Sequence, residues 1–221
     1  CRAMQADGTG MVVELGGGYR LRQAEASDHA AMEMVCLRTG DSGADATARE
    51  DDPRLLGLIY AVPYQVFAPE FAFVIEGPNG VCGYVLAVTD SAAYYAWAQR
   101  EWFPGIAATV ADPGPDKATW TRGSDWARYE IHHPDFTYPE ALHPYPAHGH
   151  IDLLPEAQGR GFGRRALEHV MAALARAGAP GMHLGVSTSN HAALAFYERL
   201  GFARLTGPGA PTHAVYMVKA L

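Results

Sequence analysis

The feature that most constrains this chain is a glycine-rich turn that joins an extended run to a helical one. Residues 149–154 are typical of a strand, and residues 161–177 have the apolar spacing of a helix. Three glycines mark the turn, at Gly159, Gly161 and Gly163. Glycines let a backbone approach an anion closely, and the free N–H groups at the start of a helix point towards it. The pattern therefore predicts a cradle for phosphate, although a turn without a ligand would carry the same glycines.

Composition limits the classes of protein to which this chain can belong. Its 221 residues are 48% hydrophobic and 19% charged, which favours one α/β domain with a hydrophobic core and excludes wholesale disorder. No stretch is long and apolar enough to predict a membrane span. The net charge of -7 argues against a nucleic-acid partner, because such binding depends on cationic side chains. A small neutral or cationic partner fits this charge better.

The cysteines and the N-terminal residues predict a compartment and a domain boundary. Cys1, Cys36 and Cys82 are widely spaced, so they predict neither a disulfide framework nor a paired zinc or redox motif. They suit a reducing cytoplasm. The first residues lack the features of a secretory signal. We therefore expect a cytoplasmic protein with an N-terminal extension over 1–18, which is upstream or vector-derived sequence, followed by one domain over 19–221.

The spacing of apolar residues predicts the order strand, helix, helix, strand, strand in the first third of the domain. The expected ranges are 19–23, 27–36, 53–60, 71–76 and 81–88. A Gly-Pro-Asn-Gly sequence over 77–80 makes the last two strands a hairpin. The polar residues 40–52 are expected to form a loop.

The segment from about 91 to 148 differs in composition from the rest and predicts an insert between strands. It contains all four tryptophans and many of the prolines, and residues 92–102 predict a helix. Long irregular connections in compact domains are usually functional. We expect the insert to pack against the domain as a lid or as part of an acceptor pocket. Its histidines lack the spacing of a zinc motif, so no metal is predicted.

The last third of the chain alternates between strand and helix. The expected strands are 149–154, 182–186 and 214–218, and the expected helices are 161–177 and 190–200. Two successive strand-to-helix units predict a locally parallel sheet with right-handed crossovers.

The glycine-rich turn has the form Gln-x-x-Gly-x-Gly, with Gln158, Gly161 and Gly163 at the fixed positions. This pattern resembles the pyrophosphate-binding loop of the GNAT superfamily of acetyl-CoA-dependent acyltransferases. The resemblance implies an α/β fold of the α+β GNAT type, with a mixed, twisted sheet of about six or seven strands flanked by helices. It also implies acetyl-CoA as co-substrate, with its pyrophosphate on the turn. The residues implied in this contact are Gln158, Gly159, Arg160, Gly161, Phe162, Gly163 and Arg164.

A second stretch, residues 186–202, looks like another diagnostic segment of the same family. Asn190, Ala193 and Tyr197 recur there at helical spacing and share one face. The resemblance implies that Asn190 binds the pantetheine arm beside Ala193, and that Tyr197 protonates the departing thiolate. A phenol with a pKa of about 10 can donate to a thiolate of pKa about 8.5 when it is held in position. Asn190 is also compatible with a simple helix cap, and Tyr197 with a core aromatic.

The strand before the glycine-rich turn would be the central strand, which parts from its parallel neighbour in GNAT folds. Free backbone groups at Leu153 and Leu154 would then align pantetheine. Transfer to an amine needs a base, because the attacking nitrogen must be uncharged. Asp152 and His150 share one strand face and are the nearest candidates; Asp152 is favoured, and Glu156 is the least favoured candidate. A polar residue at 152 is equally compatible with a structural role or a substrate anchor.

A broader resemblance covers residues 19–221. The run over 69–87, with an aromatic helix after it, is similar to the acetyltransferase-like C-terminal domain of eukaryotic O-GlcNAcase and its free-standing bacterial relatives. This resemblance implies the same fold and places Asp152 in the active site. The cofactor loop of the eukaryotic domain is degenerate, whereas the turn here is intact, so binding of acetyl-CoA is expected. The excess of arginine over lysine and the abundant alanine indicate a GC-rich bacterial source.

Together the resemblances imply an acyltransferase, namely an N-acetyltransferase that moves an acetyl group to a primary amine by direct attack. The acceptor, a small molecule or a protein, is not specified by these patterns. The alternative is an acetyl-CoA-binding pseudo-acetyltransferase module without catalysis. We expect no nucleic-acid or membrane partner, no metal, and a monomer or homodimer.

Overall fold

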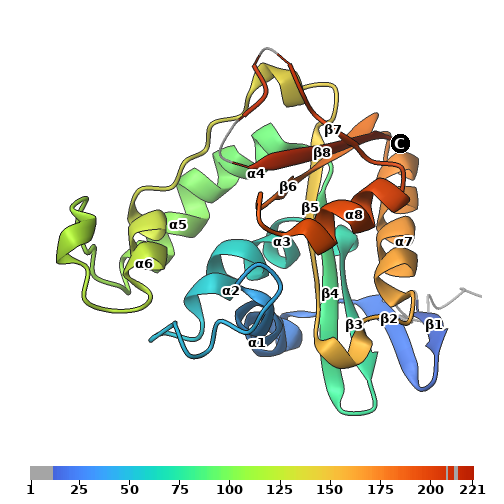
Figure 1. Cartoon of the computed structure of the whole chain (residues 1–221), viewed down its shortest axis with the longest axis horizontal. Helices are drawn as coiled ribbons and strands as arrows, with labels where there is room; N and C mark the ends of the chain where they lie inside the picture. Colours follow the sequence, from blue (N-terminus) through green and yellow to red (C-terminus); the bar gives the residue numbers. More distant parts are fainter. Residues whose placement is uncertain (1–11, 208, 212–213) are drawn as a thin grey trace, which may run out of the picture.

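Within the part of the chain that the structure describes, eight strands form one open sheet in the order β1-β2-β3-β4-β5-β6-β8-β7 (Figure 1). The computed structural model describes residues 12–207, 209–211 and 214–221, so most of the expected N-terminal extension lies outside the described residues. Neighbouring strands are antiparallel except β5 and β6, which are parallel. The strands are β1 (Val12–Gly16), β2 (Tyr19–Gln23), β3 (Ala72–Gly77), β4 (Gly80–Val88), β5 (Ala147–Leu153), β6 (Gly181–Val186), β7 (Ala203–Arg204) and β8 (Val215–Ala220).

Helices flank this sheet, as the sequence predicts. The helices are α1 (His29–Thr39), α2 (Leu55–Tyr60), α3 (Val62–Phe67), α4 (Ser91–Trp97), α5 (Phe103–Ala107), α6 (Asp125–His132), α7 (Phe162–Arg176) and α8 (His191–Arg199). The mixed sheet between helices confirms the predicted fold class.

The structure corrects the sequence-based outline at the edges of the sheet. Eight described strands form the sheet, where about six or seven were expected; the strands that the sequence did not predict are β1 and the two-residue β7. Strand β1 pairs with β2, so the sheet begins at Val12 and not at Tyr19. Both missed strands lie largely exposed, and only Leu15 of β1 is buried. Edge strands with so few buried side chains leave little of the alternating pattern from which strands are predicted.

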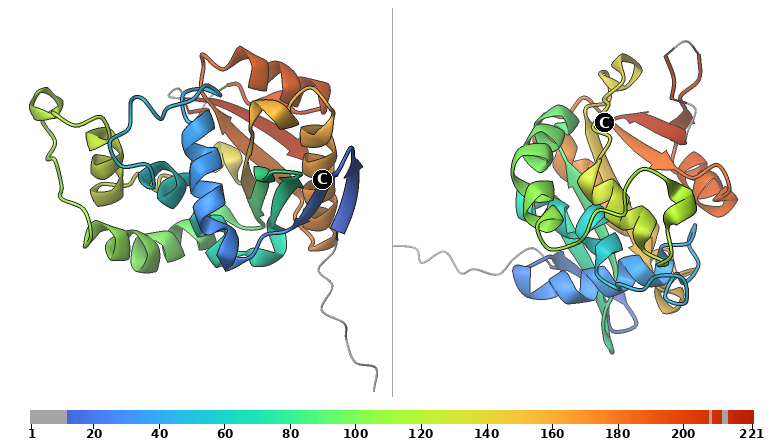
Figure 2. Two further views of the ribbon diagram at one scale, coloured as in Figure 1. Left: turned by 90° about the horizontal axis from the view of Figure 1, so that it is seen from below. Right: turned by 90° about the vertical axis from the view of Figure 1, so that its left-hand side faces the viewer.

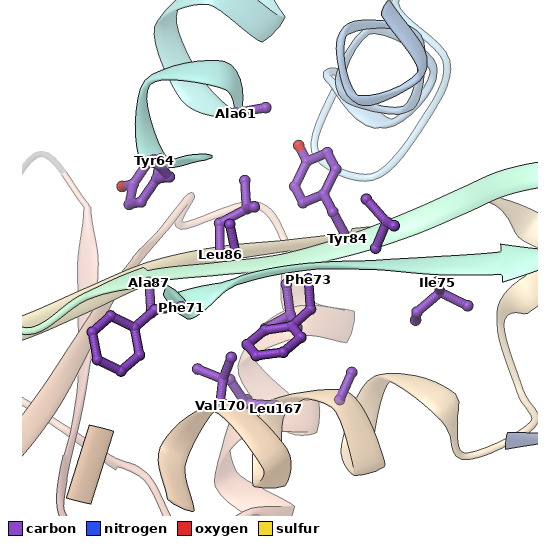
Figure 3. Close-up of a cluster of buried hydrophobic side chains, with 14 of the residues drawn as sticks. Ala61, Tyr64, Phe71, Phe73, Ile75, Tyr84, Leu86, Ala87, Leu167 and Val170 are labelled. Atoms are coloured by element: carbon purple, nitrogen blue, oxygen red, sulfur yellow. The ribbon is translucent and has the colours of Figure 1, made fainter. Parts of the chain in front are cut away.

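Helix α7 forms the main cover of one face of the sheet. Its buried residues recur three and four positions apart, which is the spacing of a single helix face. Leu167 and Val170 point towards Phe73, whereas Tyr84 and Leu86 leave the opposite face of the sheet (Figure 3). Each fully buried side chain of this kind stabilises the fold by about 1.5–3 kcal/mol through removal of apolar surface from water. The core is thus built on both faces of β3 and β4.

The insert leaves the sheet after β4 and returns to it at β5. Its first and last residues are joined, since Ser91 donates both its N–H and its Oγ–H to the carbonyl of Pro146, at 2.8 and 2.7 Å. The expected helix over 92–102 is present as α4, continued by a π-helical stretch over Ala98–Trp102. Helices α5 and α6 stand to one side of the sheet (Figures 1 and 2). They form a second apolar cluster with α2, made of Leu55, Ile59, Ala98, Phe103, Ile106, Ala127 and Ile131.

Strands β5 and β6 pair over only part of their lengths. Two register pairs join them, Ala147 with Met182 and His148 with His183. Both strands continue beyond this point without pairing, β5 to Leu153 and β6 to Val186. The expected parting of the central strand from its parallel neighbour is therefore confirmed. It leaves backbone groups of β5 available on the side that faces away from β4.

Candidate active site

The glycine-rich turn has the geometry of an anion cradle. Gly159 and Gly161 adopt the left-handed conformation, with φ of 70° and 78°. A side chain there would strain the backbone, which explains glycine at both positions. The first hydrogen bond of α7 runs from the Arg165 N–H to the Gly161 carbonyl. The N–H groups of residues 162–164 therefore have no partner within the helix and lie at its positive end.

A cavity of about 620 Å³ opens in front of this turn. Its walls come from the turn, from β5, from α8 and from the end of α1 with the loop after it. Most of the residues predicted for the site are brought together here. Those that line the cavity are Asp152, Leu153, Gln158, Gly159, Gly161, Phe162, Gly163, Arg164, Asn190, Ala193 and Tyr197.

Gln158 and Arg160 have placements that the sequence does not indicate. The Gln158 side chain donates from Nε2 to the Leu153 carbonyl at 2.7 Å, so it ties the turn back to β5. The Arg160 guanidinium lies over the Tyr19 ring, 5.1 Å from its centroid, and is not among the residues that line the cavity. Gln158 thus shapes the turn through its side chain, and Arg160 packs on β2.

Leu154 does not have the free backbone groups that were expected of it. Its N–H donates to the Cys82 carbonyl and its own carbonyl accepts from the Ala157 N–H, at 2.8 and 2.9 Å. Because successive residues of a strand direct their backbone groups to opposite sides, Leu153 and Ile151 face the gap towards β6. Both line the cavity. The pair at the gap is therefore 151 and 153 in place of 153 and 154.

Helix α8 carries Asn190 and Tyr197 on the cavity side. Asn190 caps the helix, because its Oδ1 accepts from the Ala193 N–H at 3.0 Å, and it lines the cavity as well. Tyr197 is buried, and it packs against Phe202. Burial, followed by the charge of Asp152, raises the pKa of Tyr197. This phenol therefore keeps its proton at neutral pH.

A second cavity of about 370 Å³ adjoins the first. It extends towards α2 and the insert, where Leu56, Tyr60, Trp126 and His150 line it. The residues shared by the two cavities are Thr39, Ser42, Gly43, Ile151, Asp152, Asn190, Ala193 and Tyr197. Asp152 and Tyr197 therefore lie where the two spaces meet.

Asp152 is the centre of a hydrogen-bonded group at this junction. Its Oδ2 accepts from the Tyr84 hydroxyl at 2.6 Å and lies 2.9 Å from Nε2 of His150. Burial, with the charge of Asp152, raises the pKa of Tyr84 well above its ordinary value. Glu156, the least favoured candidate base, is exposed on a 3-10 turn and lines neither cavity.

Hydrogen bonds of Ser124 and Arg128 with Asp51, here called the polar clamp, join the insert to the loop over 40–52 beside the second cavity. The Ser124 N–H donates to Asp51 Oδ1 at 2.7 Å, and its hydroxyl accepts from the Asp51 N–H at 3.0 Å. Arg128 completes the clamp with a 2.7 Å bond to Asp51 Oδ2. The loop supplies Ser42 and the insert supplies Trp126, so the clamp joins two walls of one cavity.

The insert's histidines are not gathered as metal ligands. Within residues 12–207, 209–211 and 214–221, no group of three or more His, Cys, Asp or Glu side chains has the arrangement of a metal site. His148 is buried beside the insert, where its Nδ1 lies 2.7 Å from the Ser91 hydroxyl. That hydroxyl donates to Pro146, so the imidazole must donate to it.

Residues 115–202 match the model of the acetyltransferase (GNAT) family. The crystal structure of SsHAT is 33% identical in sequence, superimposes with a TM-score of 0.82, and covers 92% of this chain and 98% of its own. The chain belongs to the GNAT acetyltransferase family. It is accordingly an acyltransferase.

Other proteins resemble this GNAT protein at lower sequence identity or over a shorter part of the chain. Protein O-GlcNAcase from Rattus norvegicus is 22% identical over 205 residues, and this chain spans 22% of its length. The [ribosomal protein bS18]-alanine N-acetyltransferase of Escherichia coli K12 is 44% identical over 56 residues, which are 25% of this chain and 38% of that protein. A phosphinothricin acetyltransferase from Sinorhizobium meliloti, solved in complex with AcCoA, shares the fold at 16% identity and a TM-score of 0.52, over 92% of this chain and 89% of its own. No helix among the described residues of this GNAT protein combines the length and apolarity of a membrane span.

Proposed function

We propose that this chain is an acetyl-CoA-dependent N-acetyltransferase that moves an acetyl group to a primary amine. The observation that carries the proposal is the meeting of two cavities at Asp152 and Tyr197. One cavity contains the anion cradle, and the other contains aromatic walls beside a carboxylate. An enzyme that joins an acyl donor to an acceptor needs two such spaces with proton-transfer groups at their junction.

The larger cavity fits coenzyme A in the chemistry of its lining. The free amides of residues 162–164 suit a pyrophosphate, and the open backbone groups of Ile151, with the Leu153 N–H, suit the amides of a pantetheine arm. Asn190 and Ala193 lie beside this path. When bound, acetyl-CoA supplies a thioester whose carbonyl carbon an amine can attack.

Tyr197 is proposed as the general acid. It lines both cavities and retains its proton at neutral pH, so it can protonate a departing thiolate. Asp152, with His150 beside it, is proposed as the source of the base function. Both groups face the space where the acceptor nitrogen would enter.

The smaller cavity favours a compact acceptor with an apolar or aromatic body. Tyr60 and Trp126 provide ring surfaces, and among the described residues Asp152 is the one acidic side chain in the lining. No lysine or arginine of this described part of the chain lines it. A carboxylate with aromatic walls attracts an amine and disfavours an acidic group. A small amine therefore fits better than an acidic peptide.

The first experiment is a calorimetric titration with acetyl-CoA. In Gly161→Asp the new carboxylate lies at the anion cradle, and we expect binding to be lost. Gly178→Asp is the matched control, because Gly178 also has a positive φ, of 88°, with open space around it, at the other end of α7. It should bind acetyl-CoA as the parent does.

A panel of primary amines, with release of free thiol as readout, then tests transfer. Release that depends on the amine supports the proposed function. Binding of acetyl-CoA without release across the panel contradicts transfer and favours a binding module. Absence of binding by the parent chain contradicts both.

A further inference from the structure

We propose that His150 is the catalytic base of the transfer and that Asp152 acts as the residue that positions it. This inference rests on the proposed function and names the base within the same site. Its basis is the arrangement of two neighbouring strands, which sets the imidazole of His150 beside the Asp152 carboxylate at the acceptor cavity, with Tyr84 bonded to the same carboxylate.

The strand register brings this group together. Residues 150 and 152 of β5 point to the same face, because side chains alternate along a strand. Tyr84 of β4 lies directly opposite Asp152 in the antiparallel register, so its side chain joins the same face. Figure 3 shows Tyr84 leaving the sheet on the side opposite Phe73, towards α1 and α2.

The Asp152 carboxylate already has two partners within the protein. Its Oδ2 accepts from Tyr84, which is fully buried, and lies next to His150. The side chain of Asp152 is 20% exposed, whereas that of His150 is 36% exposed. His150 lines the acceptor cavity and not the cofactor cavity. Asp152 lines both cavities, so both groups reach the acceptor space, but the imidazole is the more exposed of the two.

The contact with Asp152 determines which ring nitrogen of His150 can accept a proton. A bare nitrogen 2.9 Å from a carboxylate oxygen would repel it, so Nε2 carries the hydrogen. In the neutral ring Nδ1 is then unprotonated. No described residue forms a hydrogen bond with Nδ1. Tyr60 stacks on the ring at a centroid distance of 6.0 Å and an angle of 19°, which keeps it in place.

The surroundings adjust the basicity of the imidazole. Burial lowers the pKa of His150, but the charge of Asp152 and the hydrogen bond to it outweigh burial and raise it above its ordinary value. The other titratable groups near this ring are the phenols Tyr60 and Tyr84, and His148 two residues earlier on β5. The Cys36 thiol lines the same cavity, and burial raises its pKa to about 12, so it stays uncharged. Asp152 is thus the anionic partner of the ring.

With His150 as base and Tyr197 as acid, every proton that one group loses is taken up by another. His150 Nδ1 takes the proton that the attacking nitrogen loses as its bond to the carbonyl carbon forms. Tyr197 gives its phenolic proton to the sulfur as the carbon–sulfur bond breaks. The imidazolium then returns one proton, through solvent, to the tyrosinate. The products are an amide and a free thiol, with both side chains restored.

Substitution of the imidazole tests the role directly. His150→Gln keeps a polar side chain of similar length but removes the base, and we expect kcat to fall by about 100-fold or more. Affinity for acetyl-CoA should be unchanged, which also shows that the variant is folded. His143→Gln is the matched control, because His143 is exposed on the insert and lines neither cavity.

The positioning role of Asp152 predicts a pH signature. In the parent, kcat should fall with decreasing pH as His150 becomes protonated, at a midpoint above the ordinary histidine value. Asp152→Asn removes the charge that raises the pKa, so this midpoint should move to lower pH with the same amine. A purely structural residue would lower the rate without moving the midpoint.

Nitrogen-15 NMR of the histidines in the parent protein gives a readout that is independent of turnover. The spectrum should assign the Nε2–H tautomer to neutral His150. The inference alone would be overturned if His150→Gln kept full activity and an unchanged fall of kcat at low pH. It would also be overturned if neutral His150 carried its proton on Nδ1. A parent that binds acetyl-CoA but transfers to no amine would overturn the proposed function, and this inference with it.

Discussion

At the scale of single residues, Tyr197 joins the two spaces of the site. It reaches both cavities from a buried position on α8, and its pKa is raised by burial and by the charge of Asp152. Replacement by phenylalanine removes one oxygen and leaves the ring packing against Phe202 intact. The effect of that replacement should therefore be chemical and not structural.

We expect Tyr197→Phe to lower kcat by about 100-fold or more and to leave the affinity for acetyl-CoA unchanged, because only the proton donor is lost. Steady-state thiol release and calorimetry measure the two quantities. Tyr129→Phe, on α6 and outside both cavities, is the control. Turnover equal to that of the parent would remove Tyr197 from the mechanism.

Residues of the site differ in how far the sequence could predict them. Gln158, Gly161 and Tyr197 lie in local patterns, in which spacing along one turn or one helix carries the information. Tyr84 meets Asp152 only through the register of β4 and β5, which no local pattern specifies. Trp126 belongs to the insert, whose packing depends on contacts between residues that are distant in sequence. These two were therefore missed.

At the scale of elements, α7 has two separate functions. Its first turn supplies the anion cradle, and its buried face anchors that turn to the sheet. Leu167 is completely buried in this face. The position of the cradle therefore depends on side chains that do not reach the cavity.

Leu167→Ala should lower the free energy of unfolding by about 2–5 kcal/mol, because it leaves a cavity in the packed core. Denaturant unfolding, followed by circular dichroism, measures the change. Glu168→Ala, one residue along and exposed, should cost about 1 kcal/mol or less, since it removes only a surface pair with Arg164. Equal losses in the two variants would contradict the packing described for α7.

The sequence predicts helices and strands correctly where their buried residues recur at a regular spacing. The hairpin of β3 and β4, and the strands and helices after the insert apart from the two-residue β7, follow from alternation or helical spacing over many residues. Helix α3 was missed because it follows α2 after a single non-helical residue, Ala61. The parting of β5 from β6 was expected from the family resemblance and not from any residue pattern.

At the scale of the whole molecule, the clamp between Asp51 and Arg128 connects the insert to the domain. The hydrogen bond from Arg128 lowers the pKa of Asp51, against an opposing effect of burial. A carboxyl group whose pKa is lower in the folded state stabilises the fold above its ordinary pKa of 3.8. That stabilisation is lost as the pH falls through the folded value.

We therefore expect Asp51→Asn to have a lower Tm than the parent at neutral pH, with a difference that is constant above about pH 5 and shrinks below 3.8. Thermal unfolding across this range measures it. The exposed Glu70, changed to glutamine, serves as a control that should not show the same dependence. A difference that stays constant to about pH 2.5 would contradict the clamp.

The junction of Ser91 with Pro146 has a consequence for how this fold can diversify. The chain leaves the sheet and returns to it at a single carbonyl oxygen. An insert whose two ends are hydrogen-bonded to each other can change in length or sequence without moving the strands on either side. Proteins with this fold could thus differ in the whole insert, and with it in the wall of the second cavity that Trp126 provides, while the sheet and the glycine-rich turn stay unaltered.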